Sequence, residues 1–149
     1  MIDYIKLNDI YDYFISYNNL GKSFYDVING IILDEVEIDN IHVENIRNEF
    51  ILIPTIPVIA VFKMYIKYLS NKNISSKFRN LENCEYKKQF YLCLETNSLF
   101  EEYKDFEKKY AMEFGALWCE TNNLIYTLKG CPKQFDEFYL NNPVIKLLD

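Results

Sequence analysis

Apolar side chains recur every three or four residues along most of the chain, which is the periodicity of an amphipathic helix. Near the N-terminus this spacing predicts one helix over residues 8–19 and a second over residues 23–32, in which Gly30 is an unfavourable residue. Residues 34–50 fit either a strand or a helix, and we favour a helix from about Asn40. The first third of the chain is therefore predicted to be mostly helical.

The most apolar segment spans residues 49–69 and allows three alternatives: a membrane anchor, a buried strand or a core helix. Its longest run without a charge covers the thirteen residues from Phe50 to Phe62. A membrane-spanning helix needs about twenty apolar residues, and Lys63 and Lys67 interrupt any longer window. The pattern therefore disfavours an anchor, and we expect no membrane association.

Two prolines decide between the strand and the helix. Pro54 and Pro57 cannot donate hydrogen bonds to a sheet, which disfavours a central strand. Pro57 instead fits the first turn of a helix that Thr55 can cap. Beyond this turn the two lysines lie on one narrow polar stripe, and apolar side chains cover most of the remaining circumference. We therefore predict a buried central helix near residues 57–70.

The following part of the chain predicts two further long helices. A polar connection over residues 71–76 precedes a helix over residues 77–96. The next helix, over residues 98–114, has the clearest apolar stripe in the chain, and its charges agree with the helix dipole. Gly115 follows the last residue of this stripe and is expected to end the helix.

After this glycine the pattern changes, because two short runs rich in β-formers flank a polar turn. They predict a small β-hairpin near residues 117–128, and Pro132 can open a last short helix. The chain is thus predicted to be mainly α, an α+β fold in which about six helices form a compact bundle around the central helix. Its 149 residues suit one globular domain over residues 1–149.

The net charge of −6 arises entirely in the first quarter of the chain. Residues 1–40 contain eight acids and two bases, whereas residues 41–149 contain fourteen of each. Such a segment repels phosphate backbones, so we expect no nucleic-acid binding through it, and it attracts a basic protein. The alternative is an acidic surface that only aids solubility. The candidate partner-binding residues are, in order of preference, Asp34, Glu35, Glu37 and Asp39, followed by Asp9 and Asp12.

Residues with catalytic or metal-binding chemistry are sparse. The gaps between the four cysteines match no metal-binding pattern, and we expect them to be reduced. The single histidine, His42, excludes any site that needs two. Cys119 adjoins Glu120, and a neighbouring carboxylate raises a thiol pKa, so it is a poor nucleophile. The carboxylate pair of Glu113 and Glu120 is the more interesting one because aromatic residues surround it. We predict no catalytic residue, no metal site and no cofactor.

These features favour a small acidic, cytoplasmic protein-binding domain that neutralises or regulates a basic protein partner. No apolar segment follows the N-terminus, so no signal peptide is expected. In physical profile, though in no particular motif, the chain is similar to the immunity proteins that bacteria make against their own basic nuclease toxins. Two alternatives stay open: a small carboxylate- or metal-dependent enzyme, and a phage- or virus-encoded inhibitor of a host factor.

Overall fold

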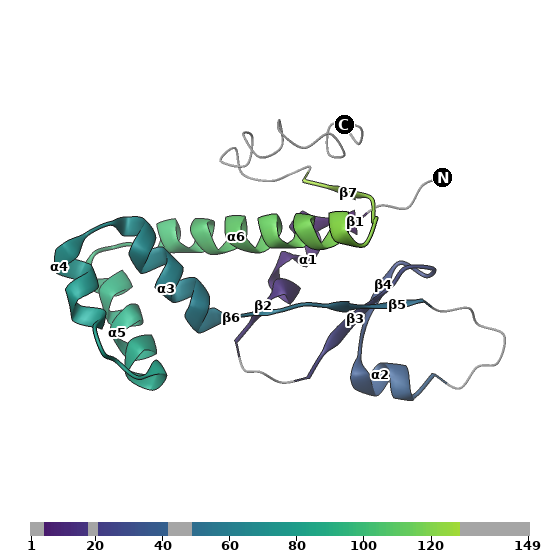
Figure 1. The fold of residues 1–149 in the computed structure, drawn as a ribbon, viewed down its shortest axis with the longest axis horizontal. Helices are drawn as coiled ribbons and strands as arrows, with labels where there is room; N and C mark the ends of the chain where they lie inside the picture. Colours follow the sequence, from purple (N-terminus) through teal and green to yellow (C-terminus); the bar gives the residue numbers. More distant parts are fainter. Residues whose placement is uncertain (1–4, 18–20, 42–48, 129–149) are drawn as a thin grey trace.

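The computed structural model describes residues 5–17, 21–41 and 49–128 (Figure 1). Within these residues six α-helices and a few short strands form a compact, mainly helical α+β fold. The predicted fold class is thus confirmed, although several individual elements differ from the prediction.

The first part of the described chain is built from short elements. In chain order they are β1 (Ile5–Lys6), α1 (Leu7–Ile10), the 3-10 helix η1 (Tyr11–Phe14), β2 (Ile15–Ser16), β3 (Ser23–Asp26), β4 (Ile31–Asp34), α2 (Glu35–Asp39), β5 (Phe50–Ile53) and β6 (Ile56–Pro57). The second part is mostly helical and comprises α3 (Val58–Leu69), α4 (Lys72–Ser75), the 3-10 helix η2 (Ser76–Phe78), α5 (Asn83–Thr96), α6 (Phe100–Thr121) and β7 (Tyr126–Thr127).

The described strands form three small sheets, of which the pair β1–β7 joins the first part to the second. Strands β3, β4 and β5 form an antiparallel sheet in the order β4-β3-β5. Two parallel pairs join distant segments: β1 pairs with β7, and β2 pairs with β6. The long helix α6 runs along one side of the molecule, with α3, α4 and α5 near its N-terminal end and α1 and the sheet below its C-terminal half (Figure 1).

Aromatic side chains form the core between α3, α5 and α6. Phe62 and Phe90 stack with their ring centroids 4.0 Å apart. Tyr103 from α6 lies edge-on to both Phe90 and Tyr65, at 4.9 Å and 5.2 Å. All four side chains are buried, so the apolar faces of the three helices meet here as their periodicity requires.

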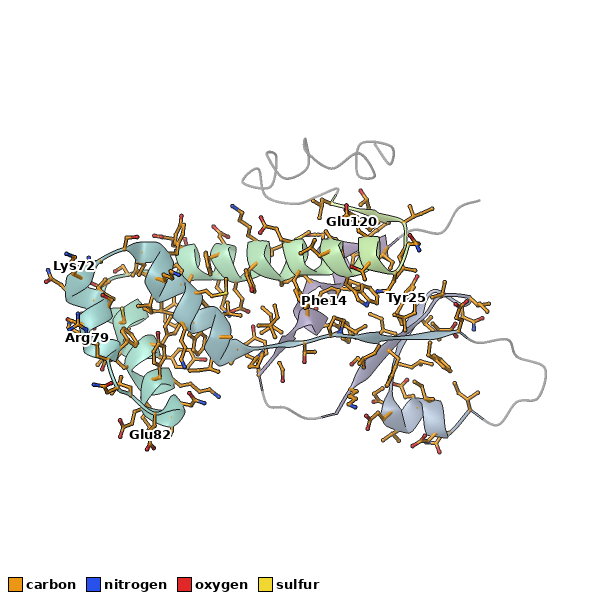
Figure 2. The ribbon with its side chains drawn as sticks, viewed as in Figure 1. Phe14, Tyr25, Lys72, Arg79, Glu82 and Glu120 are labelled. Carbon is orange, nitrogen blue, oxygen red and sulfur yellow. The ribbon has the colours of Figure 1, made fainter. Side chains whose placement is uncertain are left out.

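A second group of aromatic side chains fills the space between α6 and the sheet. Figure 2 shows Phe14 and Tyr25 there, below the C-terminal half of α6. Both rings lie edge-on to Trp118, at centroid distances of 5.6 Å and 6.1 Å, and the Trp118 indole N–H donates to the Leu52 carbonyl oxygen (3.1 Å). Trp118 therefore fixes α6 to the sheet.

The predicted core helix near residues 57–70 is confirmed as α3, in which Val58, Val61, Phe62, Tyr65 and Ile66 are buried. Its polar side is broader than predicted, because Met64 and Tyr68 are exposed together with the two lysines. Thr55 does not cap the helix; Pro57 occupies the cap position. No helix within the described ranges is long and apolar enough to span a membrane.

The helix predicted over residues 23–32 is wrong, because this segment forms the hairpin of β3 and β4. The buried Asp26 carboxylate accepts the backbone N–H groups of Ile28, Asn29 and Glu49, and Gly30 follows with a φ of +68°. These contacts fix the turn, and β3 also pairs with the distant β5. Tertiary pairing thus overrides the local helical pattern.

Two other N-terminal predictions need correction. The helix expected over residues 8–19 is limited to α1 and η1, because Ile15 leaves the helical path to pair with Ile56 of β6. Within residues 34–50, the segment that fits either a strand or a helix, the described helix is α2, which Asp34 caps, and Phe50 belongs to the strand β5. Residues 42–48, which belong to the helix predicted from about Asn40, lie outside the described residues.

The predicted helix over residues 77–96 begins later, at Asn83, because α4 and η2 occupy part of the expected connection. The helix over residues 98–114 is confirmed but continues through Gly115 to Thr121. The β-hairpin near residues 117–128 is therefore wrong: its first half is helical, and β7 pairs with β1 instead. The helix predicted from Pro132 lies outside the described residues.

Candidate functional site

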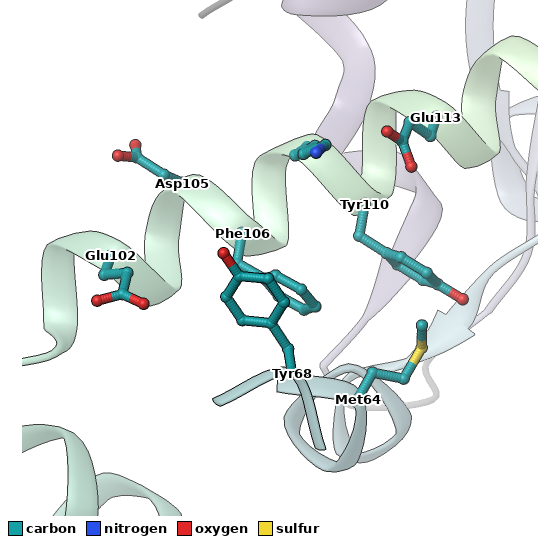
Figure 3. Close-up of a pocket in the computed structure, with 8 residues that line it drawn as sticks. Met64, Tyr68, Glu102, Asp105, Phe106, Tyr110 and Glu113 are labelled. Carbon is teal, nitrogen blue, oxygen red and sulfur yellow. The ribbon is translucent and has the colours of Figure 1, made fainter. Parts of the chain in front are cut away.

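A groove of about 420 Å³ lies between α3 and α6 (Figure 3). We name it the acidic groove. Side chains spaced three or four positions apart on each helix line it, since such residues share one helical face. They are Met64 and Tyr68 from α3 and Glu102, Asp105, Phe106, Lys109, Tyr110 and Glu113 from α6.

Aromatic rings form the apolar part of this groove. The Tyr68 and Phe106 ring centroids are 5.1 Å apart, and the Phe106 and Tyr110 rings are nearly parallel at 6.5 Å. Tyr68 is 62% exposed although it is large and partly apolar. Tyrosine combines an apolar ring with a polar tip, which is why it is enriched at protein interfaces. The groove thus resembles a binding surface more than an ordinary solvated helix face.

The charges in the groove are unbalanced, because its described lining residues include three carboxylates and one ammonium group. Partial burial raises the pKa of Glu113, and neighbouring Lys109 lowers it in part. The remaining acids, Glu102 and Asp105, are three positions apart on α6 and exposed to solvent. Carboxylates beside an exposed aromatic ring suit a cationic group, above all a planar guanidinium.

The acids predicted from sequence to bind a partner are all exposed, but they form two separate groups. Asp34 and Glu37 cap α2 reciprocally: the Glu37 backbone N–H donates to Asp34 Oδ1 (2.7 Å), and the Asp34 N–H donates to Glu37 Oε1 (3.3 Å). Glu35 and Asp39 project from the same short helix, around a Val36 side chain that is 67% exposed. This helix lies below the three-stranded sheet (Figure 1).

Asp9 and Asp12 lie on α1 and η1, between α6 and the sheet edge rather than beside α2 (Figure 1). Both side chains are exposed. The structure therefore does not bring the six predicted acids into one continuous surface, and their role in partner binding stays a prediction.

The other sequence candidates do not converge on a catalytic cleft. Glu113 lines the acidic groove, whereas Glu120 accepts a hydrogen bond from the Tyr126 hydroxyl (3.1 Å) at the end of α6. Burial and the neighbouring Glu120 raise the pKa of Cys119 to about 12, in the predicted direction. No group of three metal-ligating side chains occurs among the residues that the structure describes, and His42 lies outside them.

Sequence reasoning did not single out the acidic groove. The apolar stripe predicted for the helix over residues 98–114 includes Phe106 and Tyr110, and the sequence pattern assigns Tyr68 to neither the apolar surface nor the polar stripe of the central helix. The sequence feature that could have revealed the groove is the combination of two aromatic residues four positions apart, Phe106 and Tyr110, with acids on the adjacent helical turns. Comparison with protein-family models, curated protein sequences and solved structures finds no match to this chain.

Proposed function

We propose that this chain is a small acidic, cytoplasmic protein-binding domain that neutralises or regulates a basic protein partner. The observation that carries the proposal is the acidic groove, which the exposed Tyr68 lines together with Glu102 and Asp105. Arginine side chains of the partner would stack on the tyrosine ring and pair with the two carboxylates. A toxin neutralised by an immunity protein is one partner of this kind.

The acidic helix α2 is the second contact surface in this proposal. Its carboxylates would act mainly on the rate of association, since exposed charges steer an oppositely charged partner. The acidic groove lies between α3 and α6, whereas α2 lies below the three-stranded sheet (Figure 1). A partner that used both would have to extend along the molecule, so each surface is tested separately.

The test uses a blocked peptide with arginines at positions i and i+3, matched to the spacing of Glu102 and Asp105. The same peptide with citrulline, which is neutral and nearly isosteric, is its control. We expect the arginine peptide to bind at least about tenfold more tightly by calorimetry. The variants Y68A and E102Q/D105N should each remove this preference. Equal binding of both peptides would contradict the proposal.

A second comparison addresses the whole partner, isolated from the native host at low salt or taken as the product of the neighbouring gene. The α2 variant E35K/D39K leaves the Asp34–Glu37 cap intact, and E82K/E95K changes the net charge equally at the other end of the molecule. We expect only the α2 variant to slow association.

A separate measurement tests the enzyme alternative. If Mg²⁺ or Mn²⁺ raises the melting temperature of the protein strongly, the enzyme alternative gains support.

A further inference from the structure

A second groove, on the other exposed side of α3, has the opposite charge. It has a volume of about 540 Å³ and is lined by residues of α3, α4, η2 and the start of α5. Its charged lining residues are Lys63, Lys67, Lys72 and Arg79, and no carboxylate of the described part of the chain lines it. We name it the basic groove. Four converging positive charges are unexpected on a chain whose net charge is −6.

The local sequence explains how these cations converge. Lys63 and Lys67 are one helical turn apart on α3, the stripe that the sequence pattern already showed. Ser70 then ends α3 in the left-handed region, with a φ of 51°, and the Asn71 carboxamide oxygen caps α4 by accepting the N–H groups of Asn73 and Ile74. This turn places the next helix, and with it Lys72, against the stripe.

Residues of α4, η2 and α5 form the side of the basic groove opposite the lysines of α3. Figure 2 shows Lys72 and Arg79 at the end of the molecule formed by α4 and α5. The Lys63 ammonium lies 5.5 Å from the centre of the Tyr86 ring, and this ring is almost fully buried. Because Tyr86 is held in the core, it limits the directions that the Lys63 side chain can take.

We propose that the basic groove binds a small ligand that carries two or more phosphate groups. Like charges that converge without a counter-charge repel one another, and an anion that enters the groove removes this repulsion. A phosphate carries close to two negative charges at neutral pH, so two phosphates match the four cations. Arg79 adds a planar donor pair for bidentate phosphate contacts.

The surroundings of the groove favour a small ligand over a nucleic acid. A nucleic-acid strand would continue beyond the four cations and meet the acidic remainder of the surface. Glu82, which follows Arg79 by three positions, is exposed at the same end of the molecule (Figure 2). A compact polyphosphate needs only the four cations, and Glu82 is not among the residues that line the groove.

The experiment measures the binding of tripolyphosphate, pyrophosphate and monophosphate to the full chain by calorimetry at constant ionic strength. We expect tripolyphosphate to bind at least about tenfold more tightly than monophosphate. The variant K67Q/K72Q should weaken this binding by at least about tenfold. The matched control K88Q/K104Q removes two exposed lysines elsewhere and should leave it nearly unchanged, and Y68A should do the same.

Three results would overturn the proposal. The first is equal weakening by the control pair, which would show binding to net charge alone. The second is tighter binding of a single-stranded oligonucleotide or a glutamate-rich peptide than of tripolyphosphate, which would assign the groove to a polymer. The third is the absence of any preference for the multiply charged anions. Circular dichroism of each variant verifies that the fold is retained.

Discussion

Phe14 packs against Gly115 so closely that a Cβ atom at position 115 would lie 2.7 Å from Phe14 Cε2. The same Cβ would be 3.0 Å from the Leu7 side chain. Both Phe14 and Leu7 are fully buried, so neither can move aside freely. The glycine in the C-terminal half of α6 is therefore explained by the contact of α6 with η1 and α1.

The first prediction is that G115A destabilises the protein. Alanine favours a helix over glycine by about 1 kcal/mol, but forcing an extra atom into a packed core costs about 1–3 kcal/mol. We expect a net loss of unfolding free energy in urea denaturation. The control L117A changes an exposed side chain of the same helix and should alter stability by less than about 0.5 kcal/mol. A more stable G115A variant would show that the contact is looser than described.

The second prediction concerns Asp26, whose side chain holds the β3–β4 turn. Burial raises the pKa of this carboxyl, but hydrogen bonds from Asn29, Glu49 and Ile28 outweigh that effect and hold the pKa below its usual value. The side-chain amide of Asn29 donates to Asp26 Oδ2 (2.6 Å). Because an amide in place of the carboxylate turns a donor toward these donors, D26N should cost about 1–3 kcal/mol at pH 7.

This cost should depend on pH in a defined direction. A group with a lowered pKa in the folded state stabilises the protein above its unfolded pKa, and this stabilisation is lost as the pH falls through the folded value. The stability difference between the wild type and D26N should therefore be constant from about pH 7 to 5 and shrink below about pH 4. D39N, at an exposed carboxylate, serves as the control. A difference that does not change with pH would contradict the assigned hydrogen bonds.

How far the sequence predicts this structure depends on how local each interaction is. Helices α3, α5 and α6 follow from periodicity, because their buried faces repeat within each helix. The strand β3 does not, since its stability comes from pairing with β5, where Tyr25 lies opposite Ile51. Gly115 was misjudged as a helix end for the same reason: its partner, Phe14, lies far away in sequence.

The two grooves show the same limit for function. The lysine stripe of α3 is visible in the sequence, but its completion by Lys72 and Arg79 depends on the turn at Ser70. The acidic groove depends on a contact between two helices, in which Tyr68 of α3 packs against Phe106 of α6. Composition alone indicates the acids of residues 1–40 as candidate binding residues, because charges can be counted from the sequence. It does not show which side chains lie close together in the fold.

The third prediction is that the cysteines differ in reactivity. Cys84 is exposed, whereas Cys119 is buried with its pKa raised to about 12. At pH 8 only about one Cys119 side chain in ten thousand is a thiolate. Iodoacetamide should therefore modify Cys84 and spare Cys119, as measured by mass spectrometry of the peptides. In urea both should react at similar rates; rapid labelling of Cys119 in the native protein would contradict its packing in α6.

The fourth prediction concerns the buried carboxylate of Glu107. The Tyr17 hydroxyl donates to its Oε1 atom, while Oε2 and the Tyr103 hydroxyl are buried without a hydrogen-bond partner among the described residues. Burial and Glu107 raise the pKa values of both tyrosines, so both hydroxyls are protonated at neutral pH. The Tyr17 hydroxyl is thus the described donor to a buried polar group, which is costly to leave without a hydrogen bond.

Removing this donor should be destabilising only while the carboxylate is present. Y17F leaves Glu107 without its donor and should cost about 1–3 kcal/mol. In an E107M background the same change should be close to neutral, because replacing both polar partners by apolar groups removes the unpaired atom. A double-mutant cycle in urea measures the coupling directly, and Y13F controls for the loss of a hydroxyl at an exposed tyrosine. Equal costs of Y17F in both backgrounds would show that Tyr17 stabilises the fold through its ring alone, whereas a lower cost in the E107M background identifies the hydrogen bond that ties the N-terminal segment to α6.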